Sequence, residues 1–221
     1  MIARQLIADT IPALNHNNTA ANALDQMQEF GVEMLPVIDD QKKYIGLLTD
    51  EAILDIEDMD LPLKDLPYSL THPFVKANMH IFEVIKIAAE NNLSLIPVLE
   101  EDDVFIGTIT LQSLFRYFSN INSLTEPGAI IILSTPINSY SLSEISRIVD
   151  SCDMKVLALY VNIIRDQSKI EITIKLDKTD LSSLLNTFER FQYTVLAAFQ
   201  EKEYIQDLKE RFDEFMNFLD I

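Results

Sequence analysis

The sequence has few of the residues that disulfide, metal and catalytic chemistry need. A single cysteine, Cys152, excludes an internal disulfide framework and indicates a reducing compartment. The four glycines are too few and too far apart for a phosphate-binding loop. The three histidines are scattered and match neither a metal-ligand nor a catalytic-triad spacing. The sequence therefore predicts no catalytic site and no metal site, and we expect a protein that is not an enzyme.

Basic residues are also scarce. The chain has 17 lysines and arginines against 35 aspartates and glutamates, for a formal net charge of −18. A surface of this sign repels phosphate backbones, so we expect neither nucleic acid nor an anionic membrane as a partner. No apolar run approaches the roughly 18 residues that a membrane span needs, and the first residues lack the apolar core of a signal peptide. We expect a soluble, cytoplasmic protein.

One stretch of the sequence occurs twice. The segments LPVID…YIGLLT and IPVLE…FIGTIT share three residues at the same positions, and the second member of each pair follows the first by 61 residues: Pro36 and Pro97, Gly46 and Gly107, Thr49 and Thr110. Each copy consists of two short apolar runs around a polar turn, which predicts a hairpin of half-buried strands. The chain therefore contains an internal duplication.

The segments that precede the two hairpins also match. A helical pattern that opens near Thr19 stops at Gly31, and its copy stops at Asn91 and Asn92. Gly31 and Asn92 are again 61 residues apart, and glycine and asparagine both tolerate the left-handed conformation that ends a helix. Each copy is predicted to run extended strand, helix, strand, strand, helix. Residues 2–9 are predicted to form a short amphipathic helix that leads into the first copy.

These segments and their equal spacing resemble the CBS domain, and two in tandem resemble the pair known as a Bateman module. The resemblance predicts one repeat over residues 1–60, including the leading helix, a second over 61–118 and a linker over 119–128. It also implies two clefts between the repeats, where adenosyl compounds lie against the strands. In the family the glycine-containing strand ends in serine or threonine, and an aspartate three residues later bonds the ribose hydroxyls.

The resemblance also implies which residues of this sequence lie at these clefts. Thr49 and Thr110 match the hydroxyl position, whereas the aspartate position is occupied by Ala52 and Ser113. Beside the two prolines, Pro36 and Pro97, the residues that line the adenine pocket in the family are Leu35 and Ile96. From the residues alone, capping of the helix that follows is the favoured role of either threonine, and the prolines could simply shape the entry to a strand.

The two clefts differ in charge. A phosphate would rest at the start of the helix that follows the threonine, where backbone amides and the helix dipole attract it. In the first repeat that turn is acidic, with Asp50 and Glu51, but in the second it is Leu111 and Gln112. Arg116 and Lys76 add positive charge to the second repeat. We therefore expect the cleft at Thr110 to be the one that binds AMP, ADP, ATP or S-adenosylmethionine.

Residues 129–200 follow a different order, predicted as strand, helix, strand, strand, helix, strand. That order is typical of the ferredoxin-like fold and, after a CBS pair, resembles an ACT domain. Amino-acid-binding ACT modules tend to carry a glycine in the first strand-to-helix loop, which is absent from residues 135–140 here. Dimerisation is thus the expected role, with Asn138 and Tyr140 as candidate amino-acid contacts. Residues 201–221 are predicted to form an amphipathic helix, packed on this domain or between subunits.

The sequence thus predicts an α+β protein with two CBS repeats, a ferredoxin-like βαββαβ domain and a C-terminal helix. The expected function is that of a non-enzymatic sensor, working as a homodimer, in which a small adenosyl ligand bound between the repeats acts on a regulated protein target. Two alternatives stay open. One is a structural or partner-binding dimer whose clefts have lost their ligand, and the other is an amino-acid sensor acting through the ACT-like domain.

Overall fold

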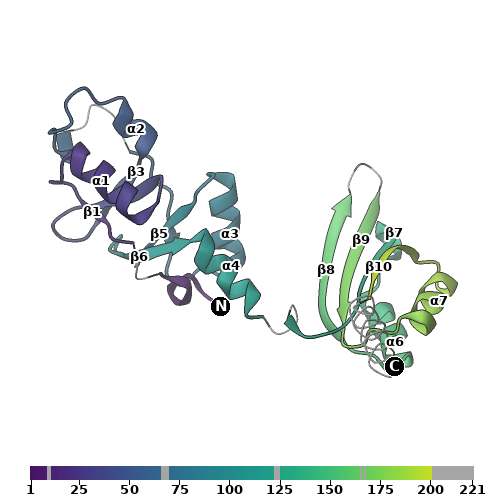
Figure 1. Cartoon of the computed structure of the whole chain (residues 1–221). Coiled ribbons are helices and arrows are strands. Elements are labelled where there is room, and N and C mark those ends of the chain that lie inside the picture. Colours follow the sequence, from purple (N-terminus) through teal and green to yellow (C-terminus); the bar gives the residue numbers. More distant parts are fainter. Residues whose placement is uncertain (9–10, 66–69, 122–124, 165, 167, 201–221) are drawn as a thin grey trace, which may run out of the picture. The chain divides into compact units, whose positions relative to one another are not determined.

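The computed structural model is a mixed α+β structure that describes residues 1–8, 11–65, 70–121, 125–164, 166 and 168–200 (Figure 1). The chain divides into two compact units, Met1–Phe118 and Ser119–Ile221. Each unit is described separately below. The amphipathic helix predicted for residues 201–221 lies outside the described residues.

The first unit contains two copies of one supersecondary motif. In the first copy the elements are β1 (Leu14–Asn15), α1 (Ala20–Phe30), β2 (Met34–Ile38), β3 (Tyr44–Thr49) and α2 (Asp50–Leu54). In the second they are β4 (Val75–Lys76), α3 (Ile81–Glu90), β5 (Leu95–Leu99), β6 (Phe105–Thr110) and α4 (Leu111–Ser119). The two sheets have the orders β1-β2-β3 and β4-β5-β6, in which the first pairing is parallel and the second antiparallel. The predicted order of elements is confirmed in both copies.

Helix α1 begins at a side-chain cap, and both α1 and α3 end in a residue with a left-handed backbone conformation. Helix α1 begins after Thr19, whose Oγ1 accepts a hydrogen bond from the Asn22 amide at 3.2 Å. It ends at Gly31, where φ is +64°. At the end of α3, Asn92 has a φ of +51°. The same left-handed turn is therefore made by glycine in one repeat and by asparagine in the other, as the sequence predicts.

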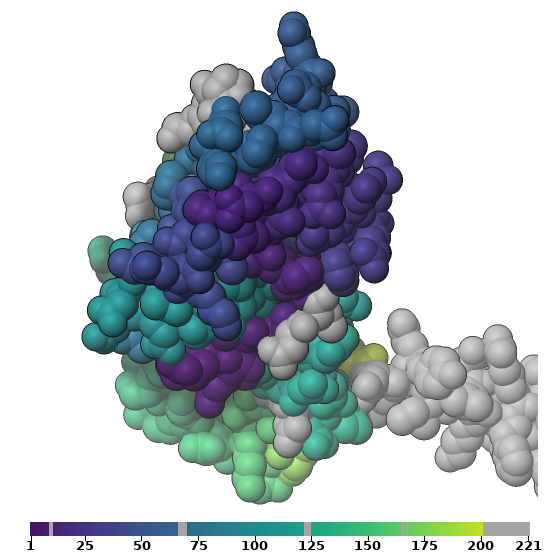
Figure 2. Space-filling view, turned by 90° about the vertical axis from the view of Figure 1, so that its left-hand side faces the viewer, coloured from purple at the N-terminus to yellow at the C-terminus, as the bar shows by residue number. Residues whose placement is uncertain are grey.

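The segment ahead of each repeat lies across the other repeat. The Ala3 amide donates to Met79 O at 2.9 Å, and the Ala8 amide donates to Thr108 O at 2.8 Å, so the N-terminal residues pair with the second repeat. Figure 2 shows these purple residues against the teal of that repeat. The connector makes the reciprocal contact, because the Leu47 amide of β3 donates to Thr71 O at 2.8 Å.

This exchange corrects the prediction for the N-terminal segment. The sequence predicts an amphipathic helix over residues 2–9, of which residue 9 lies outside the described residues, as part of the first repeat. The structure instead has a short 3-10 turn, η1 (Ala3–Leu6), and its Ala3 and Leu6 are buried in the core of the second repeat. The side chains of Ile2 and Ile7 are exposed and half-buried respectively. Of the apolar residues in this segment, Leu6 is buried, in a core formed mostly by the second repeat.

The exchange also explains the two glycines of the duplicated strands. A Cβ at Gly46 would lie 2.5 Å from Leu70 Cβ, and a Cβ at Gly107 would lie 2.4 Å from Ile7 Cγ2. Both distances are far below van der Waals contact, so each strand needs glycine where the exchanged segment crosses it. The recurrence of glycine at the same position in both repeats thus reflects a close crossing of chain segments.

The second unit has one antiparallel sheet with two helices on one face (Figure 1). Its elements are β7 (Ile130–Pro136), η3 (Ile137–Ser139), α6 (Leu142–Ser151), β8 (Val156–Ile164), β9 (Lys169–Leu176), α7 (Ser182–Arg190) and β10 (Thr194–Phe199). The strand order in the sheet is β10-β7-β9-β8. Along β9 every second residue is buried, because only one face of the sheet packs against the helices.

Helix α6 begins after Ser141, whose side chain caps it. The hydroxyl of Ser141 accepts from the Glu144 amide at 3.3 Å. The Glu144 carboxylate does not turn back to the start of the helix but accepts from the Tyr193 hydroxyl at 3.0 Å. Burial and this hydrogen bond raise the pKa of Tyr193 to about 12. The glutamate therefore ties α6 to the segment before β10.

Asp180 and Cys152 both contact serines of α7. Asp180 Oδ1 accepts from the Ser182 amide at 3.2 Å and its hydroxyl at 2.8 Å, but the residue directly before α7 is Leu181. The thiol of Cys152 is half-buried against the core and accepts from the Ser183 hydroxyl at 3.4 Å.

Candidate functional site

The first unit contains a pocket of about 400 Å³ at the start of α4. Three separate parts of the chain line it: the N-terminal segment, the end of α1 in the first repeat, and the start of α4 in the second. Its lining residues are Ile7, Ala8, Ile11, Phe30, Thr110, Gln112, Ser113 and Arg116. We call this pocket the Thr110 cleft. Three of the predicted ligand-binding residues, Thr110, Ser113 and Arg116, come together in it.

Thr110 and Ser113 hold the start of α4 by capping each other. The Ser113 amide donates to Thr110 Oγ1 at 3.0 Å, and the Thr110 amide donates to Ser113 Oγ at 3.1 Å. The Ser113 hydroxyl in turn donates to Thr110 O at 2.8 Å. The capping role that the sequence allowed for Thr110 is therefore present. Because the threonine oxygen accepts this bond, its own hydroxyl proton can still point into the cleft.

The electrostatic character of the cleft favours an anion despite the acidity of the chain. The first turn of α4 contains no acidic residue, and Arg116 follows one turn later. The amide groups and the dipole at the start of this nine-residue helix attract negative charge. Ile7, Ile11 and Phe30 add apolar side chains to the lining. The cleft is thus suited to a ligand with an anionic group at one end and an apolar, flat group at the other.

Lys76 does not belong to this cleft. Its ammonium group donates to Asp103 Oδ1 at 2.7 Å and to Glu100 O at 3.0 Å, both at the turn of the second hairpin. The bond from Lys76 holds the pKa of the Asp103 carboxyl below its usual range. Lys76 instead lines a separate cavity of about 130 Å³, together with Arg4. Sequence proximity to the repeat was a poor guide to the direction of this side chain.

The residues predicted to line an adenine pocket are in the core. Leu35 and Ile96 are both completely buried, each within the hydrophobic cluster of its own repeat. Pro36 and Pro97 are buried too, in the middle of β2 and β5, where they pair with Leu47 and Thr108. These four side chains fill the hairpins, and the lining of the Thr110 cleft does not include them.

Thr49 occupies the counterpart of Thr110 but has different surroundings. Its Oγ1 accepts from the Ala52 amide at 3.3 Å, which makes it the cap of α2. That helix has only five residues, and its first turn carries Asp50 and Glu51. A pocket of about 300 Å³, lined by Thr71, His72, Pro73, Asn91 and Leu93, includes neither Thr49 nor a residue of α2. The asymmetry between the two clefts that the sequence predicts is therefore present in the local structure.

Sequence reasoning missed the part of the cleft that comes from elsewhere in the chain. Ile7, Ala8, Ile11 and Phe30 reach the site only because the N-terminal segment crosses to the second repeat and the two repeats pack together. One signal was available. Phe30 has Asn91 as its counterpart 61 residues later, and both line a cleft. A mismatch of this kind within a duplication marks a position where the two clefts differ.

The candidate amino-acid contacts lie in the second unit, after β7. Asn138 belongs to the 3-10 turn η3 and is exposed. Tyr140 is half-buried and packs against the hydrophobic core, so its ring serves the fold. Among the residues that the structure describes, no group of three or more histidines, cysteines, aspartates or glutamates is placed to hold a metal ion. Within the same ranges, no helix is both long and apolar enough to cross a bilayer.

Comparison with known proteins places the chain in a family. The family model of the CBS domain matches residues 3–58 and again residues 62–120. Inosine-5'-monophosphate dehydrogenase of Methanocaldococcus jannaschii is 23% identical over 116 residues, which are 52% of this chain and 23% of the dehydrogenase. The chain therefore spans less than a quarter of the length of that curated relative, within the CBS region.

Two solved structures are similar to part of the chain. A protein of Methanocaldococcus jannaschii is 17% identical with a TM-score of 0.50, covering 56% of this chain and 62% of its own. The CBS protein CBSX2, solved in complex with AMP, is 20% identical with a TM-score of 0.47, covering 55% of this chain and 98% of its own. The two family matches together take in more than half of the sequence and coincide with the two copies of the motif. The chain belongs to the CBS domain family and carries its domains as a tandem pair.

Proposed function

We propose that this protein is a non-enzymatic regulator that binds a small ligand in the Thr110 cleft. The observation that carries the proposal is the mixed lining of that cleft, which combines hydroxyls, a helix start and Arg116 with aromatic and aliphatic side chains. An adenine nucleotide or another adenosyl compound combines an anionic or polar end with a flat apolar base. AMP, ADP, ATP and S-adenosylmethionine are therefore the ligands to test.

The cleft suggests how binding would be transmitted. A ligand there would contact the N-terminal segment at Ala8, the first repeat at Phe30 and the second repeat at Thr110. It would favour the arrangement of repeats in which all three contacts are made. A ligand shifts such an equilibrium only by its difference in affinity for the two arrangements. We propose that this shift is the regulatory signal, and that it acts on a regulated protein target.

We also propose that the second unit is a ferredoxin-like, ACT-like domain over residues 129–200. In support, its sheet order β10-β7-β9-β8 places the fourth strand beside the first and the third between the first and second. The loop at residues 135–140 has no glycine, which favours contact with protein over amino-acid binding. We assign residues 1–60 and 61–118 to the CBS repeats and 119–128 to a linker. The protein is proposed to work as a cytoplasmic homodimer.

Titration calorimetry of the full chain with each of the four adenosyl ligands tests the proposal. We expect binding that weakens by about ten- to a hundredfold in Arg116→Gln, since a charge-assisted hydrogen bond contributes about 1.5–3 kcal/mol. Lys76→Gln is the matched control, because Lys76 is held at the hairpin turn and does not line the cleft. No binding at millimolar concentration, or equal losses in both variants, would contradict the proposal.

A second candidate is a structural or partner-binding dimer whose clefts bind no ligand. It is favoured by Ala52 and Ser113, which stand where the family has an aspartate, and by the burial of Leu35 and Ile96. Absence of binding in the titration would support it. Amino-acid sensing is the third candidate, and a thermal shift with free amino acids that Asn138→Ala abolishes would support that role.

A further inference from the structure

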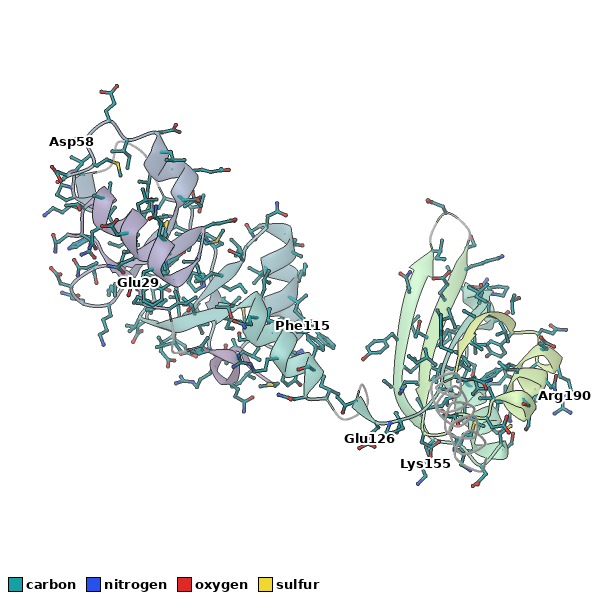
Figure 3. The ribbon with its side chains drawn as sticks, viewed as in Figure 1. Glu29, Asp58, Phe115, Glu126, Lys155 and Arg190 are labelled. Atoms are coloured by element: carbon teal, nitrogen blue, oxygen red, sulfur yellow. The ribbon has the colours of Figure 1, made fainter. Side chains whose placement is uncertain are left out.

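The sheet of the second unit is covered by α6 and α7 on one face only. The two helices pack against the side chains of that face, which include Leu133 of β7 and Ile172 of β9. Figure 3 labels Arg190 at the end of α7, one of the covering helices. We call the opposite side of the sheet the open face. Two aromatic residues of the edge strands lie on it, Tyr160 of β8 at 51% exposure and Phe199 of β10 at 56%.

The strand register divides the open face into an apolar half and a polar half. The apolar half consists of two neighbouring rows across the four strands, with Phe199, Ile130, Lys175 and Ala158 in one row and Ala197, Ile132, Thr173 and Tyr160 in the other. The next row along the strands is polar throughout, with Thr194, Ser134, Glu171 and Asn162. Leu196, in the bulge of β10 beside Ala197, is 50% exposed. The apolar half therefore lies at the end of the sheet where β10 ends.

The chain continues from this end of the sheet into residues 201–221, which lie outside the described residues. Their sequence places apolar residues at helical steps: Tyr204, Leu208, Phe212, Phe215 and Leu219. A short helix is only marginally stable alone in water, so such a stripe needs an apolar surface to pack against. From the first of these residues to the last, a helix would span about 22 Å, whereas the outer strands of a four-stranded sheet are about 14 Å apart. The segment is therefore long enough to cross the open face.

We infer that residues 201–221 cover the apolar half of the open face in their own chain. The segment begins directly after β10, at the end of the sheet where the apolar half lies. Because it is attached to that strand, its local concentration at the face is on the order of millimolar, which exceeds that of a second copy in dilute solution. A helix in this place packs on its own domain, and neither ligand binding nor the proposed dimer is needed for it.

The distribution of charge favours the same occupant. Residues 201–221 have 3 basic and 7 acidic residues, whereas residues 1–128 have 7 and 20 and therefore repel the segment. Residues 129–200 are nearly neutral, with 7 basic and 8 acidic residues. Of the eight residues in the apolar half, Lys175 alone is charged, and its sign attracts the segment. An acidic amphipathic segment thus meets less repulsion at this sheet than at the first unit of any copy.

A fluorescent reporter in the full chain tests this inference. The chain contains no tryptophan, so Phe215→Trp introduces a single emitter in the segment. We expect acrylamide to quench its fluorescence severalfold less than that of free tryptophan, because a ring packed on the sheet is shielded. Adding Tyr160→Ser and Phe199→Ser should raise the quenching severalfold. The matched control adds Val161→Ser and Ile163→Ser, which remove exposed apolar side chains from the other face of β8 and should leave the quenching unchanged.

The reverse arrangement leaves the strands almost unaltered. Here Tyr160→Trp is the reporter on the open face, and Leu208→Ser with Phe212→Ser weakens the segment. Quenching of the reporter should rise severalfold. The matched control, Gln206→Ser with Asn217→Ser, changes residues on the opposite side of the helical stripe and should have no effect. Thermal unfolding followed by circular dichroism establishes that each variant is folded.

Three results would overturn the inference. The first is a Phe215→Trp reporter that acrylamide quenches as readily as free tryptophan. The second is a variant that changes the quenching no more than its matched control does. The third is quenching that weakens as the protein concentration rises, since a second copy would then cover the face.

Discussion

Thr110 and Ser113 cap each other at the start of α4, with amide-to-hydroxyl distances of 3.0 and 3.1 Å. Removing one hydroxyl in Ser113→Ala should lower the free energy of unfolding by about 0.5–2 kcal/mol, the usual effect of losing a helix-start hydrogen bond. Chemical denaturation measures this change. An unchanged free energy would mean that water replaces the serine at no cost.

Ser113→Asp should strengthen the binding of AMP in the Thr110 cleft. The carboxylate can still accept from the Thr110 amide, and it adds the acceptor that the family uses for ribose hydroxyls. We expect the affinity for AMP to rise by about tenfold, which corresponds to one charge-assisted hydrogen bond. Ala52→Asp is the control, since it adds the same group beside the acidic start of α2. Weaker AMP binding in Ser113→Asp would place the ribose elsewhere.

Thr108 and Thr110 lie on the same face of β6, and the same substitution should have opposite effects at the two positions. Thr108 is fully buried, and within the described part of the chain its Oγ1 has no hydrogen-bond partner. Thr108→Val should therefore raise the free energy of unfolding by about 1 kcal/mol. Thr110→Val removes the cap and should lower it by about as much. Destabilisation by Thr108→Val would reveal a partner for that hydroxyl.

Gly31 is required for its backbone conformation alone. Its φ is +64° and a Cβ there would meet no atom within 4 Å. Gly31→Asn should cost less than about 1 kcal/mol, because Asn92 already occupies the equivalent turn. Gly31→Val should cost more, since a β-branched side chain disfavours positive φ. Thermal unfolding of the two variants would measure this order, and a reversed order would contradict the account.

Gly46 is required for space, and Gly46→Ala should destabilise the first unit by about 1–3 kcal/mol. The added Cβ would lie 2.5 Å from Leu70 Cβ and 2.9 Å from Thr71 O, and the second contact is with the backbone. The double change Gly46→Ala, Leu70→Ala removes the contact with Leu70 Cδ1 but leaves the contacts with the Cβ of residue 70 and with Thr71 O. It should therefore recover little stability. Full recovery would show that the connector can move away.

Alkaline pH should weaken the second unit through Tyr193. Its pKa is about 12 in the folded protein against an ordinary value of 10. The folded state therefore binds the proton more tightly, so this stabilisation is complete below pH 10 and is lost as the pH rises from 10 to 12. Tyr193→Phe should flatten the dependence of unfolding on pH over that range. Tyrosinate absorbance during titration of both proteins provides the check.

The sequence predicts local structure well here because the two repeats can be compared with each other, position by position. The paired positions of Gly31 and Asn92, and of Thr49 and Thr110, mark the same turns in both repeats. Each of these features depends on a few neighbouring residues, and the repeat shows which of them the fold needs. The order of strands and helices in the first unit could be read in the same way.

The candidate site was predicted only in part, because a cleft depends on contacts between distant segments. Thr110, Ser113 and Arg116 were found from spacing on one helix. Lys76 was misplaced, because nothing in the sequence shows that it pairs with Asp103 across the second hairpin. Phe30 was missed, since it reaches the cleft through the packing of one repeat on the other. Spacing along a chain reports the direction of a side chain only within a single element.

The segment ahead of each repeat crosses to the other repeat, and this crossing decides how much of the chain is needed for a complete core. Residues 3–8 complete the second repeat, and Thr71 completes an edge of the first. A cut between the repeats would separate each hairpin from the segment that covers it, leaving an exposed strand edge and an open core in both halves. Although the sequence repeats after 61 residues, the two repeats form one structural unit, because each needs a segment that precedes the other. A gene that lost one copy would thus encode an unfinished domain.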